Sequence, residues 1–434
     1  MISIKRIEKI CSSEFFKYSA TLLSANAISQ VISILAYPFI TRIYGPNIFG
    51  IFSLFITICS ILTLITTGKY ELAMVLPKSD KQVKAIFQLT LLLNGFFFIL
   101  LVGTVLVWRE NIAAFFHRPE LSDLLLLLPL FVLLSGFWWS LKYLLIRQKK
   151  YGNISIYNLT QSGVATVSKC IFGLQKATNI LPLRMGLAGG QLFGLFTATL
   201  TSVILGRKMI REHCTHWNKA DIKQVAKAYS NLPKYELPTE LLNVFVGNLP
   251  VLLLSMYFGE TEIGLFALAL NIGISPVTLF SGSVFQVLFR RMSEHVQNRR
   301  PLKPDCIRFC KFCLWGILPF FIIFTFAPES FFVMLFGSKW LGLGFYLKLL
   351  FPFLFLVVLT VSLGGIPDIF FKQKTVLNIE IISVIFRIIA LAIGVYYHNF
   401  NLAIVLFCAV SAAMMFVKLV WYFHLVKKYE SSLL

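Results

Sequence analysis

Residues 44–54 read YGPNIFGIFSL, and residues 258–268, 214 positions later, read FGETEIGLFAL. A second correspondence follows, because residues 147–153 (RQKKYGN) resemble residues 372–378 (KQKTVLN) at an offset of 225. Each copy lies at a turn between two apolar runs. The recurrence at corresponding turns predicts that the chain consists of two halves built on the same plan.

Apolar runs dominate the sequence on both sides of these turns. Of the 434 residues, 57% are hydrophobic and 14% are charged, and 43 are phenylalanine. Soluble domains have about 45–50% apolar and about 25% charged residues. This composition argues against a soluble enzyme, a secreted disulfide scaffold and a disordered protein. About 20 apolar residues cross a bilayer as a helix, and runs of this kind occupy residues 18–42, 47–68, 84–108, 121–146, 153–174, 184–206, 235–258, 262–288, 308–327, 341–366, 376–397 and 401–425.

Basic residues alternate between the connections of these twelve runs. The chain has 40 Lys and Arg against 19 Asp and Glu, and 29 of the basic residues fall in alternate connections against six in the others. Lys and Arg collect in cytoplasmic loops, so topology accounts for the charge without nucleic acid. Lys5, Arg6 and Lys9 precede a first run that is too long for a cleavable signal. We expect twelve membrane spans with both termini in the cytoplasm.

Six spans per half give both halves the same orientation. Their symmetry axis should therefore run along the membrane normal, and substrate should bind between the halves. The sequence predicts an all-α polytopic membrane protein of two six-helix bundles. Residues 1–206 form the first bundle, residues 207–234 a basic cytoplasmic linker and residues 235–434 the second bundle.

One basic residue lies deep in a predicted span. Arg387 is ten or more residues from either end of its run, and charge at the bilayer centre costs roughly 2.5–3.5 kcal/mol. Either Arg387 pairs with Glu380, seven residues earlier on the same face, or it lines a cavity that binds an anion. Lys169 and Lys348 lie one or two turns from the outer face, and Arg42 ends the first run.

Polar side chains recur at helical spacing in both halves. Hydrogen bonds between helices explain any one of these stripes, whereas a shared polar cavity explains them together with the deep arginine. We therefore take as candidate substrate-binding residues Arg42, Arg387, Lys169, Lys348, Asn26, Gln30, Asn158 and Asn271.

Carboxylates are nearly absent from the middle of the spans. Glu71, Glu240 and Glu380 lie toward the cytoplasmic ends. Intramembrane carboxylates relay protons or bind Na⁺, so these three are candidates for coupling to H⁺ or Na⁺, the alternative being solvated or ion-paired side chains. Lys142 and Lys418 lie near enough to the ends of their runs to snorkel.

Catalytic motifs are missing from the sequence. It has no Walker loop, no HExxH and no nucleophile elbow, so we expect no enzyme, no cofactor and no metal. Cys306, Cys310 and Cys313 have the spacing of a radical-SAM iron–sulfur ligand set, but the chain has no room for the soluble barrel of those enzymes. They fall on one helix face, where thiols behave as small apolar groups.

Two further stretches carry a family resemblance. Residues 41–50 read TRIYGPNIFG and residues 69–78 read KYELAMVLPK. Both resemble the N-terminal signature of the polysaccharide transporter family, the Wzx-type O-antigen and oligosaccharide-repeat flippases of the MOP superfamily, to which the MATE transporters also belong. Other features that fall where the family has them are Gln148-Lys149-Lys150, Gln286 with Arg290-Arg291, and Leu335-Phe336-Gly337.

This resemblance implies a function. Such proteins move an undecaprenyl-diphosphate-linked oligosaccharide, such as an O-antigen repeat unit, from the cytoplasmic to the periplasmic leaflet of the bacterial inner membrane by alternating access through a cationic cavity. The partners implied are the lipid-linked oligosaccharide, membrane lipids, a coupling ion, a polysaccharide polymerase and a chain-length regulator. The alternatives are a multidrug or cation exporter of the same superfamily, which would favour deep carboxylates, and a membrane-embedded glycan polymerase or ligase.

Overall fold

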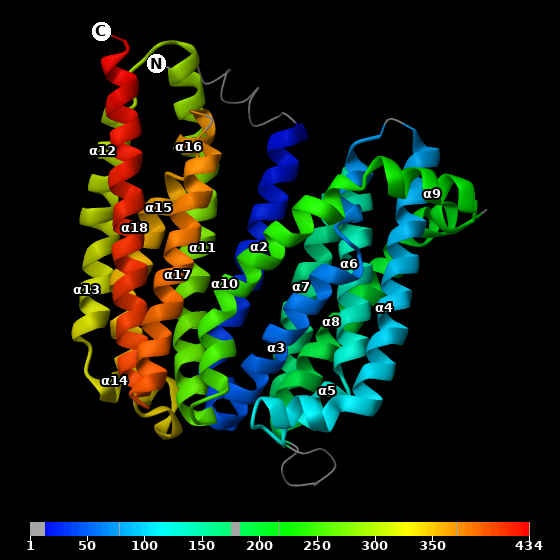
Figure 1. The fold of residues 1–434 in the computed structure, drawn as a ribbon, viewed down its shortest axis with the longest axis horizontal. Coiled ribbons are helices and arrows are strands. Elements are labelled where there is room, and N and C mark those ends of the chain that lie inside the picture. Colours follow the sequence, from blue (N-terminus) through cyan, green and yellow to red (C-terminus); the bar gives the residue numbers. More distant parts are fainter. Residues whose placement is uncertain (1–13, 78, 175–182, 216, 371, 434) are drawn as a thin grey trace. The chain divides into compact units, whose positions relative to one another are not determined.

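The computed structural model describes residues 14–77, 79–174, 183–215, 217–370 and 372–433. Every element in these ranges is helical (Figure 1), which confirms the prediction of an all-α protein. Lys5, Arg6 and Lys9 lie outside the described residues.

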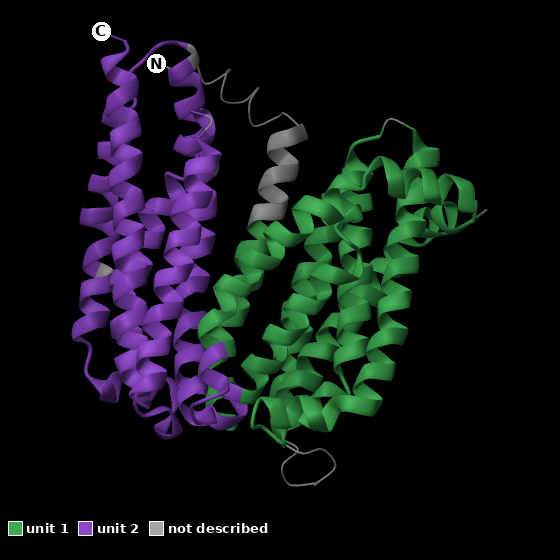
Figure 2. Ribbon diagram, viewed as in Figure 1, with its two compact units in different colours: residues 1–44, 51–252 green, residues 45–50, 253–434 purple. Residues whose placement is uncertain are grey.

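The helices group into two compact units (Figure 2). The first comprises residues 1–44 and 51–252, and the second comprises residues 45–50 and 253–434. The division therefore falls inside α10, and the first turn of α3 clusters with the second unit. The expected linker at 207–234 and the domain bounds built on it stay a prediction.

The first unit contains most of α3 and α10 together with seven complete helices and two short turns. Its elements are α2 (Glu14–Ile43), α3 (Pro46–Thr66), η1 (Tyr70–Val75), α4 (Asp80–Phe115), α5 (Leu121–Leu125), α6 (Leu128–Arg147), α7 (Tyr151–Leu174), α8 (Leu183–Cys214), α9 (Lys219–Ala228), η3 (Leu232–Glu236) and α10 (Leu237–Ser255).

The second unit follows α10 and begins with the longest helix of the described chain. Its elements are α11 (Glu260–Gln297), α12 (Lys303–Phe312), η4 (Cys313–Ile317), α13 (Leu318–Phe326), α14 (Glu329–Phe336), η5 (Ser338–Trp340), α15 (Leu343–Ser362), α16 (Ile366–Ile369), α17 (Gln373–Tyr396) and α18 (Phe400–Ser431).

Ten helical segments of the described chain are long and apolar enough to cross a membrane. The two long helices outside this set are α2 and α7. Both carry polar residues along their length, including Asn26 and Gln30 in α2 and Asn158 and Lys169 in α7, which lower their hydropathy. A multi-pass membrane fold is therefore confirmed, while the count of twelve spans and the side of the termini stay predictions.

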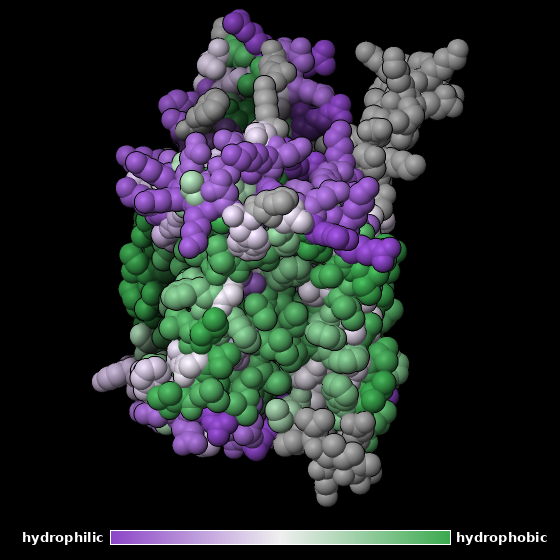
Figure 3. All heavy atoms as spheres, turned by 90° about the vertical axis from the view of Figure 1, so that its right-hand side faces the viewer, coloured by the Kyte–Doolittle hydropathy of each residue, from purple (hydrophilic) through white to green (hydrophobic). Residues whose placement is uncertain are grey.

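The surface fits this assignment. Large apolar side chains point outward along α4, where Ile99 is 72% exposed and Leu106 is 68% exposed. Figure 3 shows a broad hydrophobic band across one face, with hydrophilic residues at both ends of it. Soluble monomers rarely expose so large an apolar surface, whereas lipid tails cover such a band.

Prolines divide two of the predicted spans. The run expected at 121–146 forms α5 and α6, and α6 has Pro129 in its first turn. The run expected at 308–327 passes through a π-helical turn, η4, directly before Pro319 in α13. Proline has no N–H for the preceding helical turn and clashes with its carbonyl, so each helix is interrupted just before it.

The two copies of the repeated sequence meet at two glycines. A Cβ atom on Gly50 would lie 2.2 Å from the carbonyl oxygen of Glu260, and one on Gly264 would lie 1.8 Å from that of Pro46. Gly50 corresponds to Gly264, and Pro46 to Glu260, at the offset of 214. The contact is therefore reciprocal, and the first turns of α3 and α11 touch backbone to backbone, which requires glycine.

Aromatic rings surround this contact in the second unit. Phe49 lies edge-on to the fully buried Trp340, with centroids 5.5 Å apart. On the α11 side, Phe266 is buried and its ring lies 6.5 Å from Tyr346 and 6.4 Å from Phe407, both edge-on. The repeated sequence thus contributes to the core that joins α11, α15 and α18.

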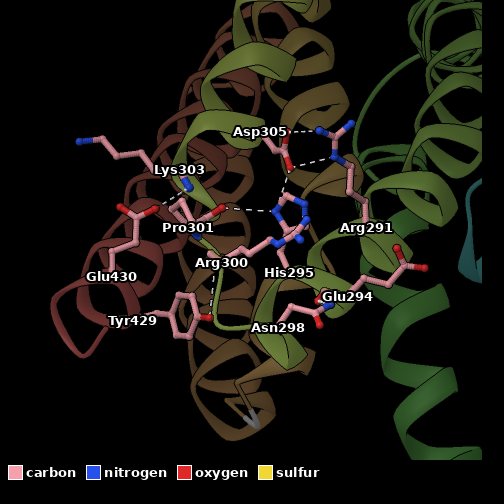
Figure 4. A network of polar contacts seen from close by, with 10 residues as sticks. All are labelled: Arg291, Glu294, His295, Asn298, Arg300, Pro301, Lys303, Asp305, Tyr429 and Glu430. Atoms are coloured by element: carbon pink, nitrogen blue, oxygen red, sulfur yellow. Dashed lines mark hydrogen bonds and ion pairs between the residues drawn. The ribbon is translucent and has the colours of Figure 1, made fainter. Parts of the chain in front are cut away.

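A polar network fixes the turn between α11 and α12 (Figure 4). Arg291 donates to both oxygens of the buried Asp305, at 2.8 and 2.9 Å, and His295 Nδ1 lies 3.3 Å from Asp305 Oδ2. The backbone N–H of Lys303 donates to Glu430 Oε1 at 2.8 Å. Since bidentate Arg–carboxylate pairs hold a fixed geometry, the network ties α12 to the ends of α11 and α18.

The reciprocal glycine contact gives a stability prediction. We expect Gly50→Ala and Gly264→Ala each to lower the melting temperature of the detergent-purified protein, because overpacking costs about 1–3 kcal/mol. Gly103→Ala in α4 is the matched control, since its Cβ would meet nothing within 4 Å and alanine favours a helix by about 1 kcal/mol. If Gly50→Ala and Gly264→Ala melted like the wild type, the backbone contact would contribute nothing to stability.

Candidate functional site

Arg387 is buried in the second unit. Its side chain leaves α17 toward α18, where the guanidinium carbon lies 6.0 Å from the centroid of the Phe407 ring. Arg387 is 8% exposed. Its Nε and Nη2 atoms have no hydrogen-bond partner among the described residues. A buried cation without a counter-charge is unfavourable, so this position favours the binding of an anion.

The ion pair considered for Arg387 is not formed within the described residues. Glu380 pairs instead with Lys418 of α18 through a very short contact between Nζ and Oε1. The sequence predicts that Lys418 snorkels toward the end of its apolar run, but its ammonium group turns to this carboxylate. Arg387 therefore makes no ion pair with the carboxylate that shares its helix face, although that carboxylate is near enough to act on its charge.

Two buried serine hydroxyls of the second unit also lack hydrogen-bond partners. Ser383 lies one turn before Arg387 on α17, and Ser411 lies one turn after Phe407 on α18. Both are buried, and the hydroxyl of each lacks a partner among the described residues. Buried hydroxyls are normally hydrogen-bonded, so a polar ligand or water would be favoured beside Arg387.

Lys169 is the corresponding cation of the first unit, and two glycines position its partner. A Cβ atom on Gly190 would lie 2.7 Å from the backbone nitrogen of Lys169, and one on Gly194 would lie 2.5 Å from the Cβ of Ala165. The small-xxx-small spacing brings α8 close to α7. As a result Gln191 reaches across, and its Oε1 accepts a hydrogen bond from Lys169 Nζ at 2.5 Å.

Lys169 also contacts two aromatic residues. Its ammonium group lies 5.5 Å from the centroid of the Phe52 ring. The fully buried Tyr44 donates its hydroxyl hydrogen to the Lys169 carbonyl at 2.8 Å. Tyr44 fits there because Gly173 and Gly186 leave space, where a Cβ would lie 2.9 and 2.4 Å from its hydroxyl oxygen.

The polar stripes of α2 and α7 meet at one hydrogen bond. Asn158 Nδ2 donates to Asn26 Oδ1 at 2.7 Å. Asn26 is exposed, and Asn158 and Gln30 are half-buried. A hydrogen bond between helices, which was one of the two explanations for the polar stripes, is therefore present. The amide side chains are nevertheless still partly exposed at the surface of the unit.

Three other candidates are at least partly exposed. Arg42 is exposed in the last turn of α2. Lys348 is half-buried, with its ammonium group 6.0 Å from the centroid of the Phe332 ring. Asn271 is exposed, and its amide donates back to the Ala267 carbonyl of its own helix at 2.8 Å.

The three carboxylates occupy different environments. Glu71 in η1 is 2% exposed, and its Oε2 has no hydrogen-bond partner among the described residues. Burial raises the pKa of Glu71, although a hydrogen bond with Thr67 and the nearby charge of Lys69 oppose the rise. Glu240 is half-buried in the first turn of α10, and Glu380 is ion-paired. The burial of Glu71 therefore favours its protonated form.

The structure thus groups some predicted residues and separates others. Asn26 meets Asn158, and Lys169 meets Gln191, whereas Arg387 faces the Phe407 ring. Sequence reasoning missed Gln191, although the glycine spacing at 190 and 194 was a signal for it. A cavity between the two units stays a prediction.

Several other basic residues of the first unit surround a pocket of about 630 Å³, and most are compensated. Arg147 pairs with Asp80 at 2.9 Å, and Lys81 pairs with Asp221 at 3.0 Å. Lys84 donates to a threonine hydroxyl at 3.1 Å. Two of the three lysine and arginine residues that line this pocket are therefore ion-paired.

Sequence comparison places the chain among proteins of glycan synthesis. A family model described as "Polysaccharide biosynthesis protein" matches residues 39–344, which confirms the resemblance found in the sequence. Teichuronic acid biosynthesis protein TuaB of Bacillus subtilis (strain 168) is 20% identical over 266 residues, which are 61% of this chain and 52% of TuaB. The match therefore spans about half the length of that relative.

Solved structures share the fold over almost the whole chain. Lipid II flippase MurJ in an inward closed conformation has a TM-score of 0.71 at 14% identity, covering 95% of this chain and 90% of MurJ. An inward-facing multidrug resistance MATE family transporter of the MOP superfamily has a TM-score of 0.67 at 16% identity, covering 95% and 99%. These similarities confirm the predicted MATE-like fold.

The buried Glu71 gives a pH prediction. Because its pKa is higher in the folded protein, the stability gained from its proton is complete below the ordinary Glu value of about 4.3 and is lost as the pH rises through the native pKa. Glu71→Gln removes this titration. We therefore expect the melting temperature of wild type, relative to that of Glu71→Gln, to fall by a few degrees between pH 4.5 and 7.5.

The exposed Glu236 provides the control for this prediction. Glu236→Gln should keep the wild-type pH profile, since its side chain is exposed in η3. A constant difference between wild type and Glu71→Gln across this pH range would contradict the role given to burial.

Proposed function

The chain belongs to the polysaccharide biosynthesis protein family, and from that premise we propose that it is a flippase for a lipid-linked oligosaccharide. Its substrate is an undecaprenyl-diphosphate-linked repeat unit, such as that of O-antigen, which it moves from the cytoplasmic to the periplasmic leaflet of a bacterial inner membrane. It does so by alternating access of two six-helix bundles and catalyses no covalent step.

The observation that carries this proposal is the buried, unpartnered guanidinium of Arg387. Within a membrane such a charge is expensive and is kept where it serves a function. A diphosphate supplies the missing negative charge and accepts hydrogen bonds from the two nitrogen atoms that lack partners. The attraction is strong because the surroundings have a low dielectric constant.

Residues of the first unit suit the remainder of such a substrate. Lys169 adds positive charge, and amide and hydroxyl groups such as those of Asn26, Gln30 and Asn158 hydrogen-bond sugar hydroxyls. Arg42, Lys348 and Asn271 are further candidates on this proposal. The lipid tail stays in the bilayer, where the apolar outer surface meets it.

Two of the similar proteins support a glycan substrate. TuaB takes part in teichuronic acid biosynthesis, and MurJ is a lipid II flippase. Coupling to H⁺ or Na⁺ through Glu71, Glu240 or Glu380, and cooperation with a polysaccharide polymerase and a chain-length regulator, are part of the proposal.

A multidrug or cation exporter is the next candidate, because MATE transporters share the fold. The buried charges argue against it, since Arg387 and Lys169 would repel a cationic drug. A glycan polymerase or ligase would instead lengthen glycan chains when the purified protein is mixed with its donor, and export of a dye or lengthening of a glycan would each contradict the flippase.

Arg387 gives the direct test of this function. In a strain that lacks the gene and has regained it on a plasmid, we expect Arg387→Gln to reduce surface polysaccharide at least about tenfold, the effect of losing one charge-assisted interaction. Arg387→Lys should retain part of the activity, because it keeps the charge. The measurement is surface polysaccharide per cell at equal protein in the membrane fraction.

Arg290→Gln is the matched control. Arg290 is exposed and paired with Glu294 one turn away on α11, at 3.0 Å, so its loss should leave export unchanged. Full surface polysaccharide in the Arg387→Gln strain would remove Arg387 from the proposed site.

A further inference from the structure

Two lysines meet at one indole ring in the first unit, where α3 ends and α4 begins. The Nζ atom of Lys142 lies 4.5 Å from the centroid of the Trp139 ring, and that of Lys69 lies 5.8 Å from it. Lys69 is 8% exposed, while Lys142 and Trp139 are half-buried. The pair therefore lies at a partly open edge of the unit.

The backbone directs Lys69 to this ring. Gly68 and Lys69 are both left-handed, with φ of 57° and 61°, a conformation that is unfavourable for a residue with a Cβ. Such strain collects at functional sites. A Cβ atom on Gly136 would lie 2.6 Å from Thr66 Oγ1, so α6 packs closely against the end of α3 and brings Trp139, one turn later, beside Lys69.

These two charges are not held in ion pairs, although carboxylates lie in their neighbourhood. Within the described residues neither lysine forms an ion pair, in contrast to Lys81 and Arg147 at the same end of the unit. Glu71 is near enough to affect Lys69 but makes no ion pair with it. The indole face attracts each ammonium group without cancelling its charge, and the two repel each other.

We propose that Lys69 and Lys142 bind a phosphate-type anion beside the indole of Trp139. Lysine binds phosphate as a point charge, and two of them on one rigid ring are held in place for one anion. This inference rests on the proposed function: the anion is the diphosphate of the lipid-linked substrate, bound here at a different step of transport from the one at which Arg387 binds it. Inorganic phosphate and the headgroup of an anionic phospholipid offer the same chemistry.

Calorimetry on the detergent-purified full chain tests this proposal, with farnesyl diphosphate, inorganic pyrophosphate and phosphatidylglycerol as probes. We expect wild type to bind farnesyl diphosphate, and Lys69→Gln and Lys142→Gln each to weaken the binding about tenfold or more. Lys142→Arg should retain binding, because it keeps the charge. The probe that binds most tightly and depends on both lysines identifies the source of the anion.

Lys149→Gln is the matched control. Lys149 is also a left-handed lysine, with φ of 57°, but it is exposed, so its loss should leave the affinity unchanged. Equal affinities of wild type, Lys69→Gln and Lys142→Gln for every probe would overturn the proposal. Should Lys69→Gln fail to give a monodisperse protein, Lys142→Gln on the regular helix α6 decides the question alone.

The outcome is separable from that of the proposed function. If Arg387→Gln abolishes export while both lysine variants bind every probe normally, this inference fails and the flippase stands. If pyrophosphate binds through both lysines in a protein that exports no lipid-linked oligosaccharide, the anion site stands and the flippase fails.

Discussion

The backbone contact between the first turns of α3 and α11 is the constraint on which the second unit depends. It brings Gly50 within reach of the Glu260 carbonyl and Gly264 within reach of the Pro46 carbonyl, so neither glycine tolerates a side chain. From it the aromatic core leads through Phe266 to the ring that faces Arg387. A repeated sequence thus fixes both the core of this unit and the setting of its buried charge.

A common arrangement surrounds the cations inside both units. Each of four basic side chains faces an aromatic ring, and none of the four forms an ion pair within the described residues. A ring stabilises a cation through its quadrupole but leaves the net charge in place, whereas a carboxylate would cancel it. The abundance of phenylalanine therefore lets this protein keep positive charge available for an anion. The pairs are Arg387 with Phe407, Lys169 with Phe52, Lys348 with Phe332 and Lys142 with Trp139.

The helices α2 and α7 carry polar side chains along their length. Both are long, and neither is among the ten apolar segments of the described chain. The Asn26–Asn158 hydrogen bond joins α2 to α7, and the Lys169–Gln191 hydrogen bond joins α7 to α8. Hydrogen bonds of this kind join membrane helices, and the exposed amide of Asn26 remains open to a substrate.

The sequence by itself determined the all-helical membrane fold, the internal repeat and the position of Arg387 within its apolar run, because span length, repeat offset and position within a run can be read from the chain without its packing. It did not decide which side chains meet. Helical spacing places Glu380 and Arg387 on one face, but because α17 packs on α18, Glu380 forms its ion pair with Lys418. The partner of a polar group depends on which helix lies against its face, and only the tertiary structure specifies that neighbour.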